Sequence, residues 1–164
     1  MTEAAASEHT LTVRVRNEFG VLSRVVGLFS ARGYNIDSLC VAESLDPAVS
    51  QITIVTRGND EELEQITKQL YKLIDVIKVI EHDPGDCIGR EMAFFKVRTQ
   101  AESRAEVMRI AEIFRSKIVD VCSDSYTIEL TGSPGKVEAF TEMLRPLGLE
   151  DVIRSGRVAV ARGL

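Results

Sequence analysis

The order in which hydrophobic periods follow one another constrains the fold of this chain most. Residues 10–16 alternate apolar and polar side chains, as in a half-buried strand, and residues 22–29 repeat apolar side chains at helical spacing. Gly20 lies between the two patterns and Gly33 follows the second, and both positions suit a residue that tolerates left-handed backbone angles. The chain is therefore expected to begin with a strand that passes through a glycine turn into an amphipathic helix.

The pattern continues as strand, strand, helix, strand. We expect strands near residues 36–42, 51–56 and 76–81, and a helix within residues 60–74 whose leucines and isoleucines recur at helical spacing. With right-handed crossovers, the order β-α-β-β-α-β gives a four-stranded antiparallel sheet with both helices on one face. This arrangement is the ferredoxin-like fold.

A second unit of the same order follows a turn-rich stretch. Residues 83–86 read Asp-Pro-Gly-Asp and break the periodic pattern, and a further β-α-β-β-α-β series extends to residue 161. The sequence thus predicts an α+β protein with two tandem ferredoxin-like units. We expect a disordered tail at residues 1–8, a first domain at 9–82, a linker at 83–90 and a second domain at 91–164.

Composition excludes several functional classes. With 45% hydrophobic and 27% charged residues, the 164-residue chain is typical of a globular protein. Its formal net charge of −5 argues against a nucleic-acid partner, and no stretch approaches the roughly 20 apolar residues of a membrane span. Three widely spaced cysteines favour neither a disulfide framework nor a zinc site, so a cytoplasmic location is expected.

The small size of each unit favours association between chains. A domain of about 75 residues has a marginal core, and a sheet covered by helices on one face leaves its edges and its other face exposed. We therefore expect an oligomer.

The turn between the first strand and the first helix has the features of a recognition site and carries no catalytic side chain. The free N–H groups of residues 20–22 lie at a helix N-terminus, where they favour a carboxylate. Asn17 and Asn35 offer amide groups that we expect near this same helix end. Such a site suits the carboxylate and the ammonium group of an amino acid.

Apolar residues beside this turn are expected to form walls for the ligand's side chain. These residues are Val21, Leu22 and Ile36. Two other interpretations remain open: Gly20 is required only for the backbone angles of a tight turn, and Leu22 and Ile36 are ordinary core residues.

The titratable residues do not form a catalytic set in the sequence. His9 and His82 fall at strand ends far apart in the chain and are expected at the surface. The acidic run at residues 60–62 lies at a helix start, where carboxylates interact favourably with the helix dipole, so we interpret it as a cap and not as a metal site.

Several motifs together resemble a known family. The chain reads Asn-x-x-Gly-Val-Leu-Ser-Arg-Val at 17–25 and Arg-Gly-Tyr-Asn-Ile at 32–36. It also reads Glu-Ile-Phe-Arg at 112–115, Ile-Val-Asp-Val at 118–121 and Arg-Ser-Gly at 154–156. These segments resemble the ACT-domain small regulatory subunit of acetolactate synthase, also called acetohydroxyacid synthase, and the likeness covers nearly everything after His9.

The resemblance implies a regulatory role and a two-chain site. It implies an N-terminal ACT domain, a homodimer that pairs its N-terminal sheets, and binding of valine or a related branched-chain amino acid at the interface. The effector-binding residues would be Asn17, Gly20, Val21 and Leu22 of one protomer, facing Asn35 and Ile36 of the other.

The resemblance also implies which chemistry belongs to the partner. The chain would stimulate a catalytic large subunit and confer feedback inhibition on it, without catalytic or metal-binding residues of its own. Thiamine diphosphate, Mg and FAD would be bound only by the catalytic subunit, and neither nucleic acid nor membrane would be a partner.

Two rival functions come from other classes. The first is an ACT-domain amino-acid sensor that regulates a different enzyme, which the matches in the second half disfavour. The second is a small ferredoxin-like hydrolase such as an acylphosphatase, which needs an arginine-bearing phosphate loop after the first strand. Here that loop contains Asn17 to Gly20, and Arg24 already belongs to the helix.

Overall fold

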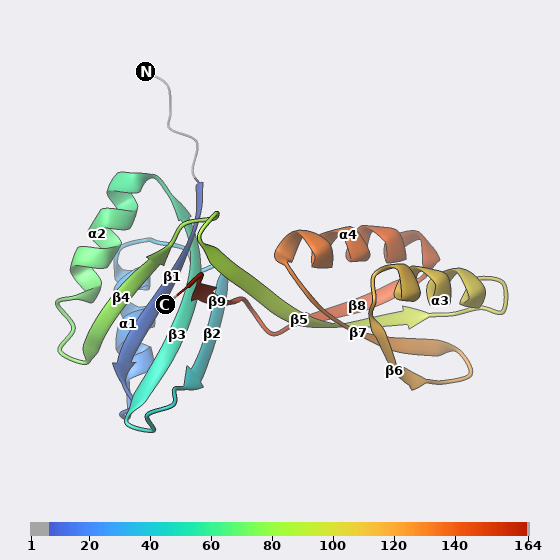
Figure 1. Cartoon of the computed structure of the whole chain (residues 1–164), viewed down its shortest axis with the longest axis horizontal. Helices are drawn as coiled ribbons and strands as arrows, with labels where there is room; N and C mark the ends of the chain where they lie inside the picture. Colours follow the sequence, from blue (N-terminus) through green and yellow to red (C-terminus); the bar gives the residue numbers. More distant parts are fainter. Residues whose placement is uncertain (1–6, 164) are drawn as a thin grey trace, which may run out of the picture. The chain divides into compact units, whose positions relative to one another are not determined.

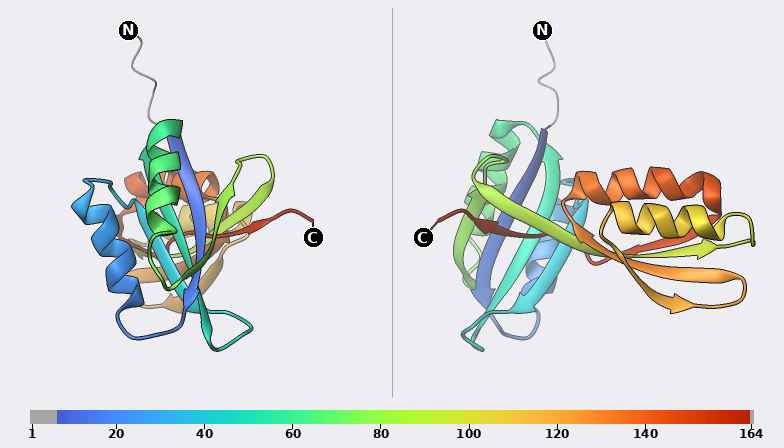
Figure 2. Two further views of the ribbon diagram at one scale, coloured as in Figure 1. Left: turned by 90° about the vertical axis from the view of Figure 1, so that its left-hand side faces the viewer. Right: turned by 45° about the vertical axis from the view of Figure 1, so that its right-hand side comes forward.

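The computed structural model describes residues 7–163, in which the chain forms two compact units (Figure 1). The first unit runs to Ile88 and also contains the C-terminal segment that begins at Arg157; the second is Gly89–Gly156. Each unit follows the order β-α-β-β-α-β, and both helices of each unit lie on one face of its sheet (Figures 1 and 2). The predicted α+β fold with two tandem ferredoxin-like units is confirmed.

The first unit is a four-stranded antiparallel sheet in the order β2-β3-β1-β4. Leu11 pairs with Ile54 and Val13 with Ile52, and these four side chains are buried beneath the helices together with Phe29. The edge strands are β2 and β4. The elements are β1 (Ser7–Arg16), α1 (Val21–Ala31), β2 (Ser38–Glu43), β3 (Val49–Gly58), α2 (Asp60–Leu70) and β4 (Val76–His82).

The second unit repeats this topology with its own core. Its strands follow the order β6-β7-β5-β8, and β9 pairs with β5 outside that path. Phe95 and Phe140 pack edge to face with their ring centroids 4.8 Å apart, a favourable aromatic geometry. The remaining elements are β5 (Cys87–Arg98), α3 (Arg104–Ile113), β6 (Lys117–Val121), β7 (Ser125–Gly132), α4 (Pro134–Leu144), a 3-10 turn (Arg145–Leu147), β8 (Leu149–Arg154) and β9 (Val158–Ala161).

The observed units differ from the expected domain boundaries. Strand β1 begins at Ser7, inside the expected tail, whose residues 1–6 lie outside the described residues. The expected linker at 83–90 is a turn followed by the start of β5, and the segment from Arg157 packs with the first unit. The reason is non-local: Arg157 bonds to Thr10 and Ser38, β9 contacts β4, and the N–H of Arg162 donates to the carbonyl oxygen of Asp86 at 2.8 Å.

The helices begin with different capping chemistry. Asn59 caps α2 in a reciprocal capping box with Glu62, and Ser133 caps α4 with Pro134 in its first turn. The N-cap residue of α1 is instead Gly20, which has no side chain to cap the helix. No helix within residues 7–163 is both long and apolar enough to cross a membrane.

Part of the face of the first sheet that points away from its helices is covered, around two buried threonines. Thr10 and Thr12 are buried on this face, and β9 contacts β4. His82 was expected at the surface but is buried, with its Nε2 2.8 Å from the hydroxyl of Thr12. Burial lowers the pKa of His82 below its ordinary value, because the charged imidazolium loses its hydration.

Candidate functional site

The turn between β1 and α1 leaves the first N–H groups of the helix without a side-chain cap. Gly20 is the N-cap residue and adopts left-handed backbone angles, with φ at 79°. Its carbonyl oxygen accepts from the N–H of Arg24 at 3.1 Å, so the helix starts at once. The left-handed φ explains the glycine by backbone conformation alone, and the uncapped helix end is in addition suited to a carboxylate.

A cation lies beside this helix end. A Cβ atom on residue 20 would lie only 3.1 Å from Nη1 of Arg24, so the guanidinium group flanks Gly20. Arg24 Nε and Nη2 donate to the same carboxylate oxygen of Asp75, at 2.9 and 2.6 Å. Asp75 is buried, whereas Arg24 is about half exposed. The ion pair therefore fixes the guanidinium group of Arg24 while part of it remains accessible to solvent.

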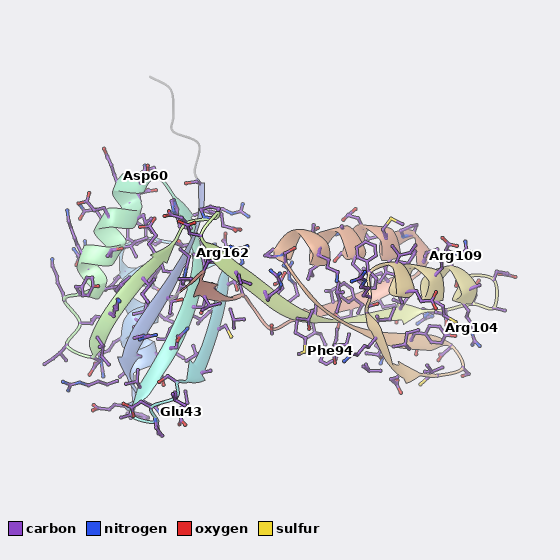
Figure 3. The ribbon with its side chains drawn as sticks, in the orientation of Figure 1. Glu43, Asp60, Phe94, Arg104, Arg109 and Arg162 are labelled. Atoms are coloured by element: carbon purple, nitrogen blue, oxygen red, sulfur yellow. The ribbon has the colours of Figure 1, made fainter. Side chains whose placement is uncertain are left out.

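Asn17 joins the turn to the hairpin between β2 and β3. Its backbone N–H donates to the carbonyl oxygen of Ala48 at 2.8 Å, and its side-chain Nδ2 donates to the carbonyl oxygen of Pro47 at 2.9 Å. The same Nδ2 lies 3.5 Å from a carboxylate oxygen of Glu43, which is labelled in Figure 3 at the end of β2. Among residues 7–163, no donor bonds to Oδ1 of Asn17, so this oxygen is available to an ammonium group.

Asn35 and Ile36 lie between the end of α1 and the start of β2. The carbonyl oxygen of Asn35 accepts from the hydroxyl of Thr56 at 2.6 Å, and its side-chain Nδ2 donates to Asp37 at 2.5 Å. Ile36 is half-buried and packs against the core of the first unit. The exposed amide of Asn35 therefore sits on a segment that β3 holds in place.

One chain does not bring Asn17 and Asn35 together, contrary to the sequence-based expectation that they lie near the same helix end. Thr56, which bonds to Asn35, pairs with His9 near the start of β1, whereas Asn17 follows the end of that strand. These two levels of β1 are eight residues apart, so a rise of roughly 3.3 Å per residue separates the two asparagines by roughly 26 Å. The helix α1 runs between them, so they flank its opposite ends.

The apolar candidates divide into core and surface. Val21 is only 3% exposed and belongs to the core, so the expectation that its side chain forms a wall of the site is wrong. Leu22 is 40% exposed, which contradicts the interpretation of Leu22 as a core residue. Near the start of α1, the exposed wall is therefore Leu22, and the N–H of Val21 already donates to the carbonyl oxygen of Glu18 at 3.3 Å.

Sequence reasoning missed two charged neighbours of the site. Arg24 lies next to Gly20 and Glu43 lies near Asn17, so charges of opposite sign flank the turn. Arg24 was identifiable in principle, because residues four apart on a helix share a face and Gly20 is the N-cap. Glu43 was not, because only the pairing of β2 with β3 brings it to this end of the sheet.

The structure offers no site for a catalytic metal among the described residues. Within residues 7–163, no group of three or more His, Cys, Asp or Glu side chains is arranged to hold a metal ion. The cysteines Cys40, Cys87 and Cys122 are free thiols.

Two family models match almost all of the chain. A model described as "AHAS small subunit-like ACT domain" matches residues 11–78. A second, described as "Small subunit of acetolactate synthase", matches residues 90–163.

Individual relatives cover nearly the full length. The probable acetolactate synthase small subunit of Methanothermobacter thermautotrophicus is 45% identical over 164 residues, which are 99% of this chain and 98% of that protein. The acetolactate synthase small subunit of Haemophilus influenzae is 49% identical over 154 residues, 93% of this chain and 94% of that one. The crystal structure of the acetolactate synthase small subunit from Thermotoga maritima superposes with a TM-score of 0.90 at 42% identity, over 96% of this chain and 99% of that one.

Proposed function

This chain belongs to the family of acetolactate synthase small subunits, and from that premise we propose that it regulates acetolactate synthase by binding a branched-chain amino acid. In this proposal the chain stimulates the catalytic subunit and confers feedback inhibition by valine or a related amino acid. The chain itself is non-catalytic, and thiamine diphosphate, Mg and FAD belong to the catalytic partner. The three free thiols support a cytoplasmic location.

We further propose a homodimer that pairs the β2 edges of two first units. The two edges of this sheet differ. On the β4 edge, the hydroxyl of Tyr71 accepts from the N–H of Val79 at 3.1 Å and lies 3.4 Å from its carbonyl oxygen, so a side chain occupies the groups that another strand would need. Strand β2 pairs with β3 on one side and leaves its outer edge open to a second copy.

Antiparallel pairing of two β2 strands brings the separated asparagines together. A twofold axis through the middle of β2 places the start of one strand opposite the end of the other. Asn35 precedes the start of β2, and Asn17 lies near Glu43 at its end. Asn35 of the partner subunit then approaches Asn17, and the symmetry creates two equivalent sites. The separation of these two residues within one chain is the observation that carries the proposal of a shared site.

The groups at such a site match the parts of valine. The carboxylate meets the uncapped N–H groups of α1 and the guanidinium of Arg24. The ammonium meets the amide oxygens of the two asparagines and the carboxylate of Glu43. Leu22 of the chain that supplies the helix end and Ile36 of the partner subunit form the apolar wall, so the small aliphatic side chain is the selected feature.

Feedback inhibition follows by linkage. Valine shifts the activity of the catalytic subunit only to the extent that it binds one arrangement of the regulatory dimer more tightly than another. To shift the two arrangements of the dimer from a ratio of 1:99 to 99:1, valine must bind one of them roughly 10⁴-fold more tightly than the other. A ligand as small as valine is therefore expected to inhibit the catalytic subunit only partially.

Calorimetric titration of the isolated chain with valine, leucine and isoleucine tests the proposal. One of the three should bind with a stoichiometry of two per dimer, and addition of the chain to the catalytic subunit should raise turnover and make it sensitive to the same amino acid. A chain that binds the amino acid without changing the turnover of that subunit would instead be a sensor for another enzyme. Condensation of pyruvate by the isolated chain would contradict the non-catalytic role.

A further inference from the structure

The C-terminal segment returns to the first unit through a nearly buried arginine. Arg157 is the first residue of that segment, and its side chain is 16% exposed. Its Nη1 donates to a carboxylate oxygen of Glu8 at 2.6 Å and to the hydroxyl of Thr10 at 3.0 Å. Both partners belong to β1, so the arginine is fixed on the face of the sheet that points away from the helices.

The backbone of the same residue reaches a second strand. The N–H of Arg157 donates to the hydroxyl of Ser38 at 2.9 Å, and Ser38 is the first residue of β2. Ser38 pairs with Val55 and Val55 pairs with Thr10, so these three residues form one row across β2, β3 and β1. Arg157 thus joins the two ends of this row and bridges strands that do not pair with each other.

The contact at Ser38 supports the segment that supplies half of the proposed effector site. Asn35 and Ile36 precede Ser38 by three and two residues. Strand β3 holds the segment through the hydroxyl of Thr56 on Asn35 and through the carbonyl oxygen of Val55, which accepts from the N–H of Asp37 at 2.8 Å. The bond from Arg157 fixes the other end of the segment, where it becomes the β2 edge.

We propose that Arg157 is a positioning residue for effector binding, which rests on the proposed function of the first unit. It holds residues 35–38 in the geometry that presents Asn35 and Ile36 to the ligand. Because Gly156, the last residue of the second unit, precedes it directly, a change at residues 35–38 on effector binding reaches the end of the second unit through one peptide bond. By linkage, tighter docking of Arg157 strengthens effector binding, and effector binding tightens that docking.

Three variants test the role of the side chain. Arg157→Ala removes the bonds that Nη1 donates to Glu8 and Thr10. Arg157→Lys keeps a charged donor but loses the planar guanidinium and its reach. Arg162→Ala is the matched control. Arg162, labelled in Figure 3, lies in the same segment with an exposed side chain, and its backbone bond to Asp86 survives the substitution. In titrations with valine, Arg157→Ala should weaken binding by at least about fivefold, the lower end of typical coupling between sites. Arg157→Lys should recover part of this loss, and Arg162→Ala should bind like the wild type.

Hydrogen exchange of the ligand-free protein provides a readout that does not depend on valine. Amides of residues 37–43 should exchange faster in Arg157→Ala than in the wild type, while amides of α2 should not change. If Arg157→Ala fails to fold, Ser38→Ala removes only the hydroxyl acceptor and should produce the same pattern.

The outcomes separate the two proposals. Wild-type protein that binds valine, together with an Arg157→Ala variant that folds and binds it equally well, overturns the positioning role and leaves the proposed function intact. Unchanged exchange of residues 37–43 in that variant also overturns the positioning role. Wild-type protein that binds none of the three branched-chain amino acids overturns the proposed function, and the positioning role for effector binding falls with it.

Discussion

The substitution Gly20→Asp should abolish the response to valine while leaving the fold intact. It places a carboxylate at the helix end where the ligand's carboxylate is proposed to bind. Two like charges about 4 Å apart repel by about 4 kcal/mol at an effective dielectric constant of about 20, which corresponds to a roughly 10³-fold loss of affinity. Arg24 flanks the position and offsets part of this repulsion, so we expect binding to weaken by about 100-fold or more.

The backbone cost of this substitution is small and can be controlled. A non-glycine residue at a φ of 79° costs about 1 kcal/mol, and aspartate and asparagine tolerate this region best. The new Cβ meets the end of the flexible Arg24 side chain, which can shift. Gly20→Asn has the same shape and the same strain without the charge, so calorimetry on both variants isolates the electrostatic effect. Wild-type valine affinity in Gly20→Asp, or an equal loss of affinity in Gly20→Asn and Gly20→Asp, would rule out a carboxylate site at this helix end.

The remaining predictions concern recognition and stability. Asn17→Ala and Asn35→Ala should each weaken valine binding by about 10- to 150-fold, because each loses a hydrogen bond to a charged group that contributes about 1.5–3 kcal/mol. If a variant instead unfolds at a lower temperature and binds valine with normal affinity, that asparagine has a structural role. Burial lowers the pKa of His82, so the unfolded state binds more protons than the folded state below about pH 6.5. The free energy of unfolding should therefore decrease as the pH is lowered below this value, by up to about 1.4 kcal/mol per pH unit. His82→Gln, followed by urea denaturation between neutral and mildly acidic pH, should flatten this dependence, and an unchanged profile contradicts the assignment. Asp75→Asn, which alters the ion pair with Arg24, should lower the free energy of unfolding by about 1–2 kcal/mol. Glu64→Gln, which removes an exposed i,i+4 pair with Lys68, should lower it by less than about 0.5 kcal/mol. Equal losses in urea denaturation would show that the Arg24–Asp75 pair does not stabilise the fold more than the exposed pair.

Local patterns were sufficient to predict the elements and their order. The alternation around Leu11 and Val13 and the helical spacing of Leu63 and Ile66 each arise from one buried face, and the structure buries those residues. Gly20 was identified correctly as the turn residue because few other residues adopt its φ. The topology then follows from the crossover rule, which leaves few ways to connect these elements.

The sequence did not reveal features that depend on contacts between distant segments. His82 is buried beside Thr12 of the neighbouring strand, and the chain returns to the first unit at Arg157; neither residue carries a local signal of these distant contacts. The prediction that Asn35 lies near Asn17 failed for a related reason. Both residues flank α1, but the length of that helix separates them. In the proposed dimer, the second copy of the chain joins them.

Mixing Asn17→Ala with Asn35→Ala and titrating the mixture with valine tests directly whether two chains share the effector site. Each variant alone has two damaged sites per dimer. After subunit exchange, half of the dimers are mixed, and one of their two sites combines an intact Asn17 from one chain with an intact Asn35 from the other, so about a quarter of all sites should regain wild-type affinity. Each variant taken alone through the same exchange is the control. If mass spectrometry confirms mixed dimers and no high-affinity sites appear, the two asparagines do not share a site across the interface, and the account is wrong.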